Sequence, residues 1–172
     1  MFPSPRQKPV PRSGGLSVPD PGRERRAERR ARELLKSCVG PEEWEMYRDL
    51  GFIRVYGRSR RAGQPRYAYL VYPRKPLVAF FPATGELIAE YCVEFPDLDG
   101  QRLPPSDDVL AKWMALTSDE ERLLRRANMH LVGRQHDPAR VRRDLWRLAA
   151  WERRRSARRS GRRSDPSVGL SP

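Results

Sequence analysis

The sequence predicts an α+β fold: an antiparallel sheet of three to four strands with flanking N-terminal and C-terminal helices and disordered, basic chain ends. Apolar residues recur at the helical period before residue 51 and after residue 105. Between these two segments they follow the period of a strand, and Gly- or Pro-containing turns separate the runs. Short turns join neighbouring strands only when the strands are antiparallel. We expect the helices to pack on one face of this sheet.

The N-terminal segment predicts a tail followed by two helices. Residues 1–20 are rich in proline, serine and glycine, so they bury too little surface to offset their chain entropy and are expected to be disordered. Asp20 and Pro21 predict the start of a helix, because an N-cap residue is followed by proline in the first turn. A second helix is predicted over residues 41–50, which begin with proline and two glutamates.

The middle of the chain predicts the strands, over residues 52–56, 67–72, 77–81 and 87–95. Tyr67 and Tyr69 share a face of the second strand. Aromatic sheet faces flanked by arginine stack single-stranded bases in some nucleic-acid-binding proteins. Aromatic residues are also ordinary strand formers, and the predicted helices are numerous enough to cover a small sheet. Core packing is therefore the expected role of these tyrosines.

Three more helices are predicted after the sheet. Ser106 is the expected N-cap of the first helix, over residues 107–116. A capping box over residues 118–121 opens the second helix, which ends near Asn128. The segment that follows is expected to be a loop.

The last predicted helix starts at Asp137 and Pro138 and ends near Arg155. Its apolar stripe consists of Val141, Leu145, Leu148 and Ala149. A single domain over residues 21–155 is therefore expected, with residues 156–172 as a disordered basic tail.

Charge is concentrated at the two ends of the chain. Residues 1–40 hold 10 Lys/Arg and 4 Asp/Glu, residues 41–139 hold 14 and 15, and residues 140–172 hold 11 and 3, giving net charges of +6, −1 and +8. Two basic ends suit a polyanion, because each phosphate that is neutralised releases condensed counterions. Arginine outnumbers lysine by 31 to 4. A GC-rich coding sequence would also favour arginine, but it would not explain the uneven distribution of charge.

The candidate nucleic-acid-binding residues are arginines of the last helix and of the stretch that continues it. Most of those on the helix are expected on the side opposite its apolar stripe. The full set is Arg140, Arg143, Arg147, Arg153, Arg154, Arg155, Arg158 and Arg159. They predict a non-enzymatic accessory protein that contacts the backbone of nucleic acid non-specifically. For these arginines two alternatives stay open: a protein partner with an acidic surface, and a solvated tail without a dedicated partner. The alternative function is a protein–protein interaction module, in which the middle domain binds a partner and the basic tails only aid solubility.

No catalytic residue, metal or cofactor is predicted from a motif, because the chain lacks CxxC, HExxH, G-x-S-x-G and a glycine-rich phosphate loop. Four carboxylates, those of Glu90, Glu94, Asp107 and Asp108, would suit a divalent ion if they converged, as in nuclease sites. Acidic residues at a helix start are favoured by the helix dipole in any case. A metal-dependent enzyme is therefore the third alternative.

The remaining features favour a cytoplasmic protein. Two cysteines in a chain of this length do not form a disulfide framework, so Cys38 and Cys92 are expected to be reduced. No apolar run approaches the roughly 18–20 residues that a membrane span needs, so no membrane partner is expected. The proline-rich start has no apolar region of the kind found in signal peptides.

A resemblance is carried by the segments EYCVEF, LPPSDDVLAKWMAL and DEERLLRRANMHLVGRQ. With the run from Asp107 to Lys112 and the pair Ala127 and Asn128 as its marks, the chain resembles a group of small bacterial proteins that have no established activity. The resemblance covers roughly residues 34–151. It implies a bacterial, cytoplasmic, single-domain protein, and it carries no catalytic role over to this chain.

Overall fold

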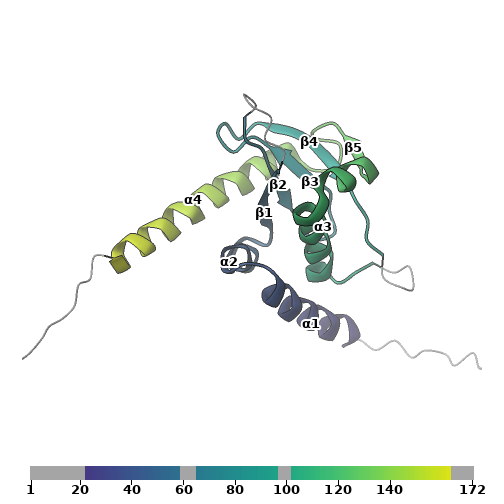
Figure 1. Ribbon diagram of the computed structural model, residues 1–172, viewed down its shortest axis with the longest axis horizontal. Coiled ribbons are helices and arrows are strands. Elements are labelled where there is room, and N and C mark those ends of the chain that lie inside the picture. Colours follow the sequence, from purple (N-terminus) through teal and green to yellow (C-terminus); the bar gives the residue numbers. More distant parts are fainter. Residues whose placement is uncertain (1–21, 59–64, 97–101, 164–172) are drawn as a thin grey trace, which may run out of the picture.

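The computed structural model describes residues 22–58, 65–96 and 102–163 of the chain. They form an α+β fold with four helices and one five-stranded antiparallel sheet (Figure 1). The predicted fold class is confirmed, although the sheet has one strand more than expected. In chain order the elements are α1 (Arg23–Cys38), α2 (Pro41–Leu50), β1 (Ile53–Tyr56), β2 (Ala68–Val71), β3 (Leu77–Phe80), β4 (Leu87–Cys92), α3 (Pro105–Arg126), β5 (Asn128–His130) and α4 (Pro138–Arg163). The expected N-terminal tail, residues 1–20, lies outside the described residues.

The fifth strand, β5, occupies a segment predicted to be a loop. Asn128 pairs with Cys92 of β4, and His130 pairs with Glu90. Three residues are too few to show the alternation by which a strand is recognised, so only the pairing with β4 reveals it. The strands lie side by side in the order of the chain, β1 to β5.

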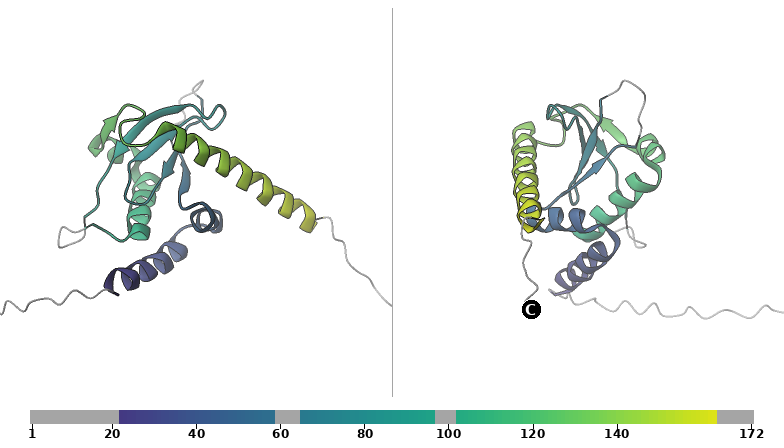
Figure 2. Two further views of the ribbon diagram at one scale, coloured as in Figure 1. Left: turned by 180° about the vertical axis from the view of Figure 1, so that it is seen from behind. Right: turned by 60° about the vertical axis from the view of Figure 1, so that its left-hand side comes forward.

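Helices cover both faces of the sheet, whereas the sequence predicted them on one face. Figure 2 shows α4 on one side of the sheet and α3 on the other. One core cluster joins β-strand residues such as Tyr69 and Leu77 to Leu116 of α3, and the second joins others such as Leu70 to Leu148 of α4. The reason is that every residue of β2 and β3 is buried. Strands that are apolar on both faces need a cover on each.

The tyrosines of β2 pack in the core, as expected from their strand position. Tyr69 is 2% exposed, and its hydroxyl donates a hydrogen bond of 2.6 Å to Glu120 of α3. Tyr67, just before β2, donates to the same carboxylate oxygen at 2.7 Å. The ring of Tyr69 therefore belongs to the core, and the partly buried ring of Tyr67 packs against it.

The two helices predicted between residues 107 and 128 form one kinked element, α3. The kink lies at Asp119, which has non-helical dihedral angles (φ −149°, ψ 81°). Its carboxylate accepts a hydrogen bond of 3.0 Å from the backbone N–H of Arg122, so Asp119 is the N-cap of the second half. The cap therefore lies one residue later than the predicted capping box, which began at Ser118.

The start of α3 is capped by another helix. Ser106 was the expected N-cap, but α3 already begins at Pro105. The backbone N–H and the hydroxyl of Ser106 instead donate hydrogen bonds to Glu28 of α1, at 3.0 and 2.5 Å. The carboxylate of Glu28 thus lies at the positive end of the α3 dipole, which favours negative charge.

Alkaline pH is expected to unfold the protein cooperatively. Burial is the main cause that raises the pKa of Tyr47, Tyr69, Tyr72 and Tyr91 above the ordinary 10.0. Groups with a raised folded-state pKa contribute stability that is complete below pH 10.0 and is lost as the pH rises above it. Lys112, whose pKa is lowered by burial, contributes no further change above its ordinary pKa of 10.5.

The measurement is a pH titration that follows tyrosinate absorbance and helical circular dichroism together. We expect most of the absorbance change to coincide with the loss of helical signal above pH 10.0. Full ionisation of the tyrosines with the helical signal intact would contradict this prediction.

Candidate nucleic-acid interface

Helix α4 carries all the arginines that the sequence singled out. Asp137 caps its first turn, because its carboxylate accepts a hydrogen bond of 3.0 Å from the backbone N–H of Ala139. The first half of the helix packs on the sheet through Val141, Leu148 and Trp151, all of which are buried. The indole of Trp151 is the last large apolar group on the helix.

Helix α4 extends away from the body of the protein at its C-terminal end (Figure 1). It ends at Arg163 rather than near Arg155, so the expectation of a disordered tail from residue 156 is corrected for residues 156–163. Arginine and alanine are good helix formers, and residues 152–159 contain little else. The rest of the predicted tail, residues 164–172, lies outside the described part of the chain.

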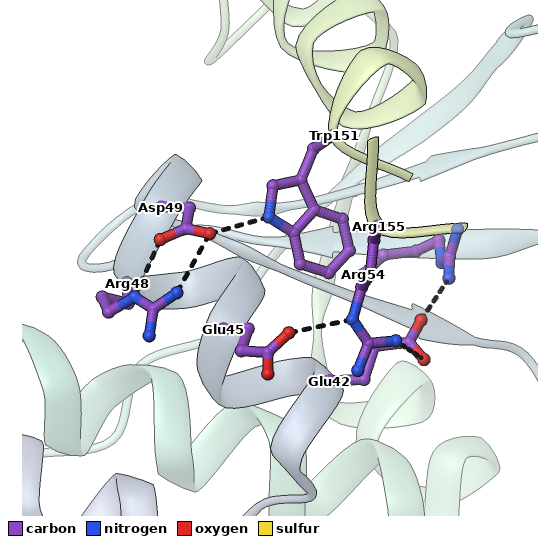
Figure 3. A network of polar contacts seen from close by, with 7 residues as sticks. All are labelled: Glu42, Glu45, Arg48, Asp49, Arg54, Trp151 and Arg155. Atoms are coloured by element: carbon purple, nitrogen blue, oxygen red, sulfur yellow. Dashed lines mark hydrogen bonds and ion pairs between the residues drawn. The ribbon is translucent and has the colours of Figure 1, made fainter. Parts of the chain in front are cut away.

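A network of ion pairs holds α4 against α2 (Figure 3). The guanidinium of Arg155 donates hydrogen bonds of 2.9 Å to both Glu42 and Glu45 of α2. Arg54 of β1 pairs with Glu42 at 3.5 Å and with Glu152 of α4. The network therefore joins a strand and two helices that lie about a hundred residues apart in the sequence.

Trp151 adds a second link between these helices. Its indole N–H donates a hydrogen bond of 2.9 Å to Asp49 at the end of α2. The hydrogen bond from Arg48 lowers the pKa of Asp49, and the bond from Trp151 lowers it further. Asp49 is therefore ionised at neutral pH, and its charge is matched by Arg48, at 2.8 Å.

Two of the eight candidate arginines act within the fold. Arg155 belongs to the network with α2, and its guanidinium also lies 5.5 Å from the centre of the Trp151 ring. Arg147 pairs with Asp144 at 2.8 Å and donates to the carbonyl of Leu50 at 3.4 Å. Both therefore point back towards α2 rather than standing free on the side opposite the apolar stripe.

The other six candidate arginines are exposed and form no ion pair with any described residue. They are Arg140, Arg143, Arg153, Arg154, Arg158 and Arg159. The structure brings them onto one continuous helix, although it distributes them around its circumference. A guanidinium presents five donors in a planar fork that fits phosphate oxygens. Six such groups on one helix therefore offer a phosphate backbone several donors that suit its oxygens.

A groove of about 640 Å³ runs between α2 and the C-terminal half of α4, from Trp151 to Arg159. Arg154, Arg158 and Arg159 line it from α4, and Glu45 and Asp49 line it from α2. Both carboxylates already accept hydrogen bonds from Arg155, Arg48 or Trp151. The arginines of the groove are therefore left with unused donors.

Two exposed residues of α4 were not singled out from the sequence. Arg142 is exposed beside Arg143, and Trp146 is 69% exposed. The helical period gave the only signal for Trp146, because the position falls outside the apolar stripe of α4.

Two of the four carboxylates of the metal hypothesis, Glu90 and Asp108, have separate partners within the fold. Glu90 is buried and accepts backbone hydrogen bonds from Gly133 at 2.8 Å and Gln135 at 2.7 Å, which hold the loop after β5. Asp108 forms an ion pair of 2.6 Å with Lys112. Among the residues that the structure describes, no group of three or more His, Cys, Asp or Glu is placed to hold a metal ion.

An exposed apolar surface lies at the other end of the molecule. Met129 of β5 and Leu131, just after it, are 66% and 72% exposed. They lie at an edge of the sheet, because β5 is its last strand. Exposed apolar side chains at a sheet edge are the kind of surface on which a protein partner docks.

Comparison of the chain with protein-family models, with curated proteins and with solved structures finds no match. The resemblance to small bacterial proteins therefore stays an expectation. In the described part of the chain, no helix has a stretch long and apolar enough to cross a membrane.

Proposed function

We propose that this protein binds nucleic acid through phosphate contacts from the arginines of α4 and acts as a non-enzymatic accessory factor. The observation that carries the proposal is the set of six exposed arginines that have no ion-pair partner among the described residues. They stand on a helix that extends beyond the body of the domain (Figure 2).

Charge balance within the fold supports this function. The carboxylates nearest to α4 are occupied by Arg48, Arg54 and Arg155. The six exposed arginines of α4 that form no ion pair with described residues therefore stay available to an external polyanion. Arginines spread around a helix contact phosphates regardless of base sequence, so the binding is non-specific.

The test is a salt titration of the full chain with a fluorescent duplex and a fluorescent single strand of random sequence. The logarithm of the binding constant should fall linearly with the logarithm of the salt concentration. Each phosphate contact on a duplex contributes about −0.9 to the slope of this log–log plot. If five of the arginines make contacts at the same time, the slope is about −4.5. Absence of binding to either strand form near 0.1 M salt, or a binding constant independent of salt, would overturn the proposal.

Protein–protein interaction is a second candidate function, favoured by the exposed Met129 and Leu131 at the β5 edge. A partner there would contact the end of the sheet that carries β5 and would leave the arginines of α4 unused. Replacing both residues with serine would then abolish capture of the partner while the salt dependence of nucleic-acid binding stays the same.

A further inference from the structure

Trp146 is a large apolar side chain on the solvent side of α4. Its ring is 69% exposed, although tryptophan usually stabilises a fold by burial. Within the described part of the chain, no guanidinium and no other aromatic ring stacks on it. Most of the side chain is therefore open to a partner that the described part of the domain does not supply.

Trp146 borders a groove of about 340 Å³ between α4 and the turn that joins β3 to β4. Pro82 and Ala83 line the groove from the turn, and Leu145 and Ala149 line it from the helix. These side chains are apolar, and the carboxylate of Glu152, which also lines the groove, is paired with Arg54. The volume is at the lower end of the range for pockets that hold small ligands or parts of larger ones.

Exposed arginines lie on both sides of Trp146 along the helix. Arg142 and Arg143 are one turn before it, and residues three or four apart are neighbours on a helix surface. Arg153 follows seven residues later, which is about 10 Å along the helix axis. An aromatic ring between cationic groups is the arrangement by which proteins bind single strands: bases stack on the ring and phosphates contact the arginines.

Two occupants of the α4 face around Trp146 are compared by their charge: a second copy of the chain and a polyanion. A second copy of the chain would bring a net charge of +13 against the same exposed arginines, so the two copies would repel each other. A polyanion is attracted instead. In a duplex the bases are paired and stacked on each other, so a base reaches the indole only from a single strand.

We propose that the ligand class of α4 is single-stranded nucleic acid, with one base stacked on Trp146 beside the β3–β4 turn and the flanking phosphates on Arg142, Arg143 and Arg153. This inference rests on the proposed function, because it assigns the strand form that the same helix binds. It also gives the protein a preference that phosphate contacts alone do not provide.

The test compares the full chain with its Trp146→Ala variant, for a random single strand and for a duplex at the same salt concentration. Removing a stacking ring weakens single-strand binding by about 5- to 150-fold. Duplex binding should change by less than about twofold, because phosphate contacts do not use the ring. Trp146→Phe, which keeps an aromatic face, should retain most of the single-strand affinity.

Met114→Ala is the matched control, since Met114 is also an exposed large apolar residue (53%). It belongs to α3, which lies on the other side of the sheet from α4 (Figure 2). The control variant should bind both strand forms as the unchanged protein does. Circular dichroism of each variant reports whether the fold is retained, which the exposure of both residues leads us to expect.

The outcomes separate the two proposals. If the unchanged protein binds both strand forms with a steep salt dependence and Trp146→Ala binds the single strand equally well, the stacking inference is wrong and the proposed function stands. If the unchanged protein binds neither form, both fail. If Trp146→Ala instead changes only the sedimentation of the protein alone, the ring lies in a contact between copies and the inference is wrong.

Discussion

Replacing Lys112 with methionine lowers the free energy of unfolding by about 3–5 kcal/mol, because it leaves a buried carboxylate without its counter-ion. The side chain of Lys112 is 1% exposed, and its ammonium donates hydrogen bonds to Asp108 (2.6 Å) and to the carbonyls of Tyr72 (3.2 Å) and Lys75 (2.8 Å). Methionine has a similar length but no donor. The carboxylate of Asp108 then keeps only the hydrogen bond from the backbone of Arg74.

The matched control is Arg125→Met, which breaks an ion pair of the same spacing in the same helix. Arg125 and Glu121 are also four residues apart and 2.6 Å from each other, but their side chains are 66% and 80% exposed. Exposed pairs of this kind contribute about 0.3–0.5 kcal/mol. Urea unfolding followed by circular dichroism measures both variants, and equal losses of stability would show that burial is not the cause.

A double variant separates the lost ion pair from the lost packing. Lys112→Met combined with Asp108→Asn removes both charges, so it should be more stable than Lys112→Met alone. A double variant less stable than the single one would mean that the cost comes from the lysine stem and its carbonyl contacts rather than from the unpaired carboxylate.

Changing Arg154, Arg158 and Arg159 to glutamine together weakens nucleic-acid binding on the order of 100-fold at 0.1 M salt, if each contacts one phosphate. The slope of the log–log salt dependence becomes shallower by about 2.7 for a duplex, since each lost contact removes about 0.9. These residues make no ion pair with described residues, so the stability of the fold should stay the same. Fluorescence anisotropy over a range of salt concentrations measures both quantities.

The control removes the same number of charges from another surface. Arg122, Arg126 and Arg134 are exposed and likewise form no ion pair in the described part of the chain. Their change to glutamine leaves the net charge equal to that of the α4 variant. If both triple variants lose the same affinity, the overall charge of the protein determines binding and α4 is not the contact surface.

The sequence predicted the fold class and most of the elements because their signals are local. The kink at Asp119 coincides with the boundary expected between two helices, and Asp137 caps α4 as its position before a proline indicated. The strand β5 and the helix cover on both faces were missed, because both depend on pairing between segments far apart in the chain. The continuous apolar runs of β2 and β3 were the available signal for the second cover.

The sequence predicted which helix carries the candidate arginines, but it did not predict which partners their side chains have. The charge pattern located the arginines on the last helix, but it treated Arg147 and Arg155 like the others. Only the three-dimensional contacts with Asp144, Glu42 and Glu45 show that these two stabilise the fold. The helical period puts Trp146 outside the apolar stripe of α4, so its exposure was predictable. The groove beside it was not, because the distant turn between β3 and β4 forms the other wall.

The chain-order arrangement of the strands has a kinetic consequence. The connections between β1, β2, β3 and β4 are short, so the pairing of these four strands has a low entropic cost and we expect it early in folding. The link between Trp151 and Asp49 joins residues 102 positions apart, so it closes a much longer loop and should form after the sheet. We therefore expect the strands in the middle of the chain to pair first, and α4, the most basic helix, to dock on them afterwards.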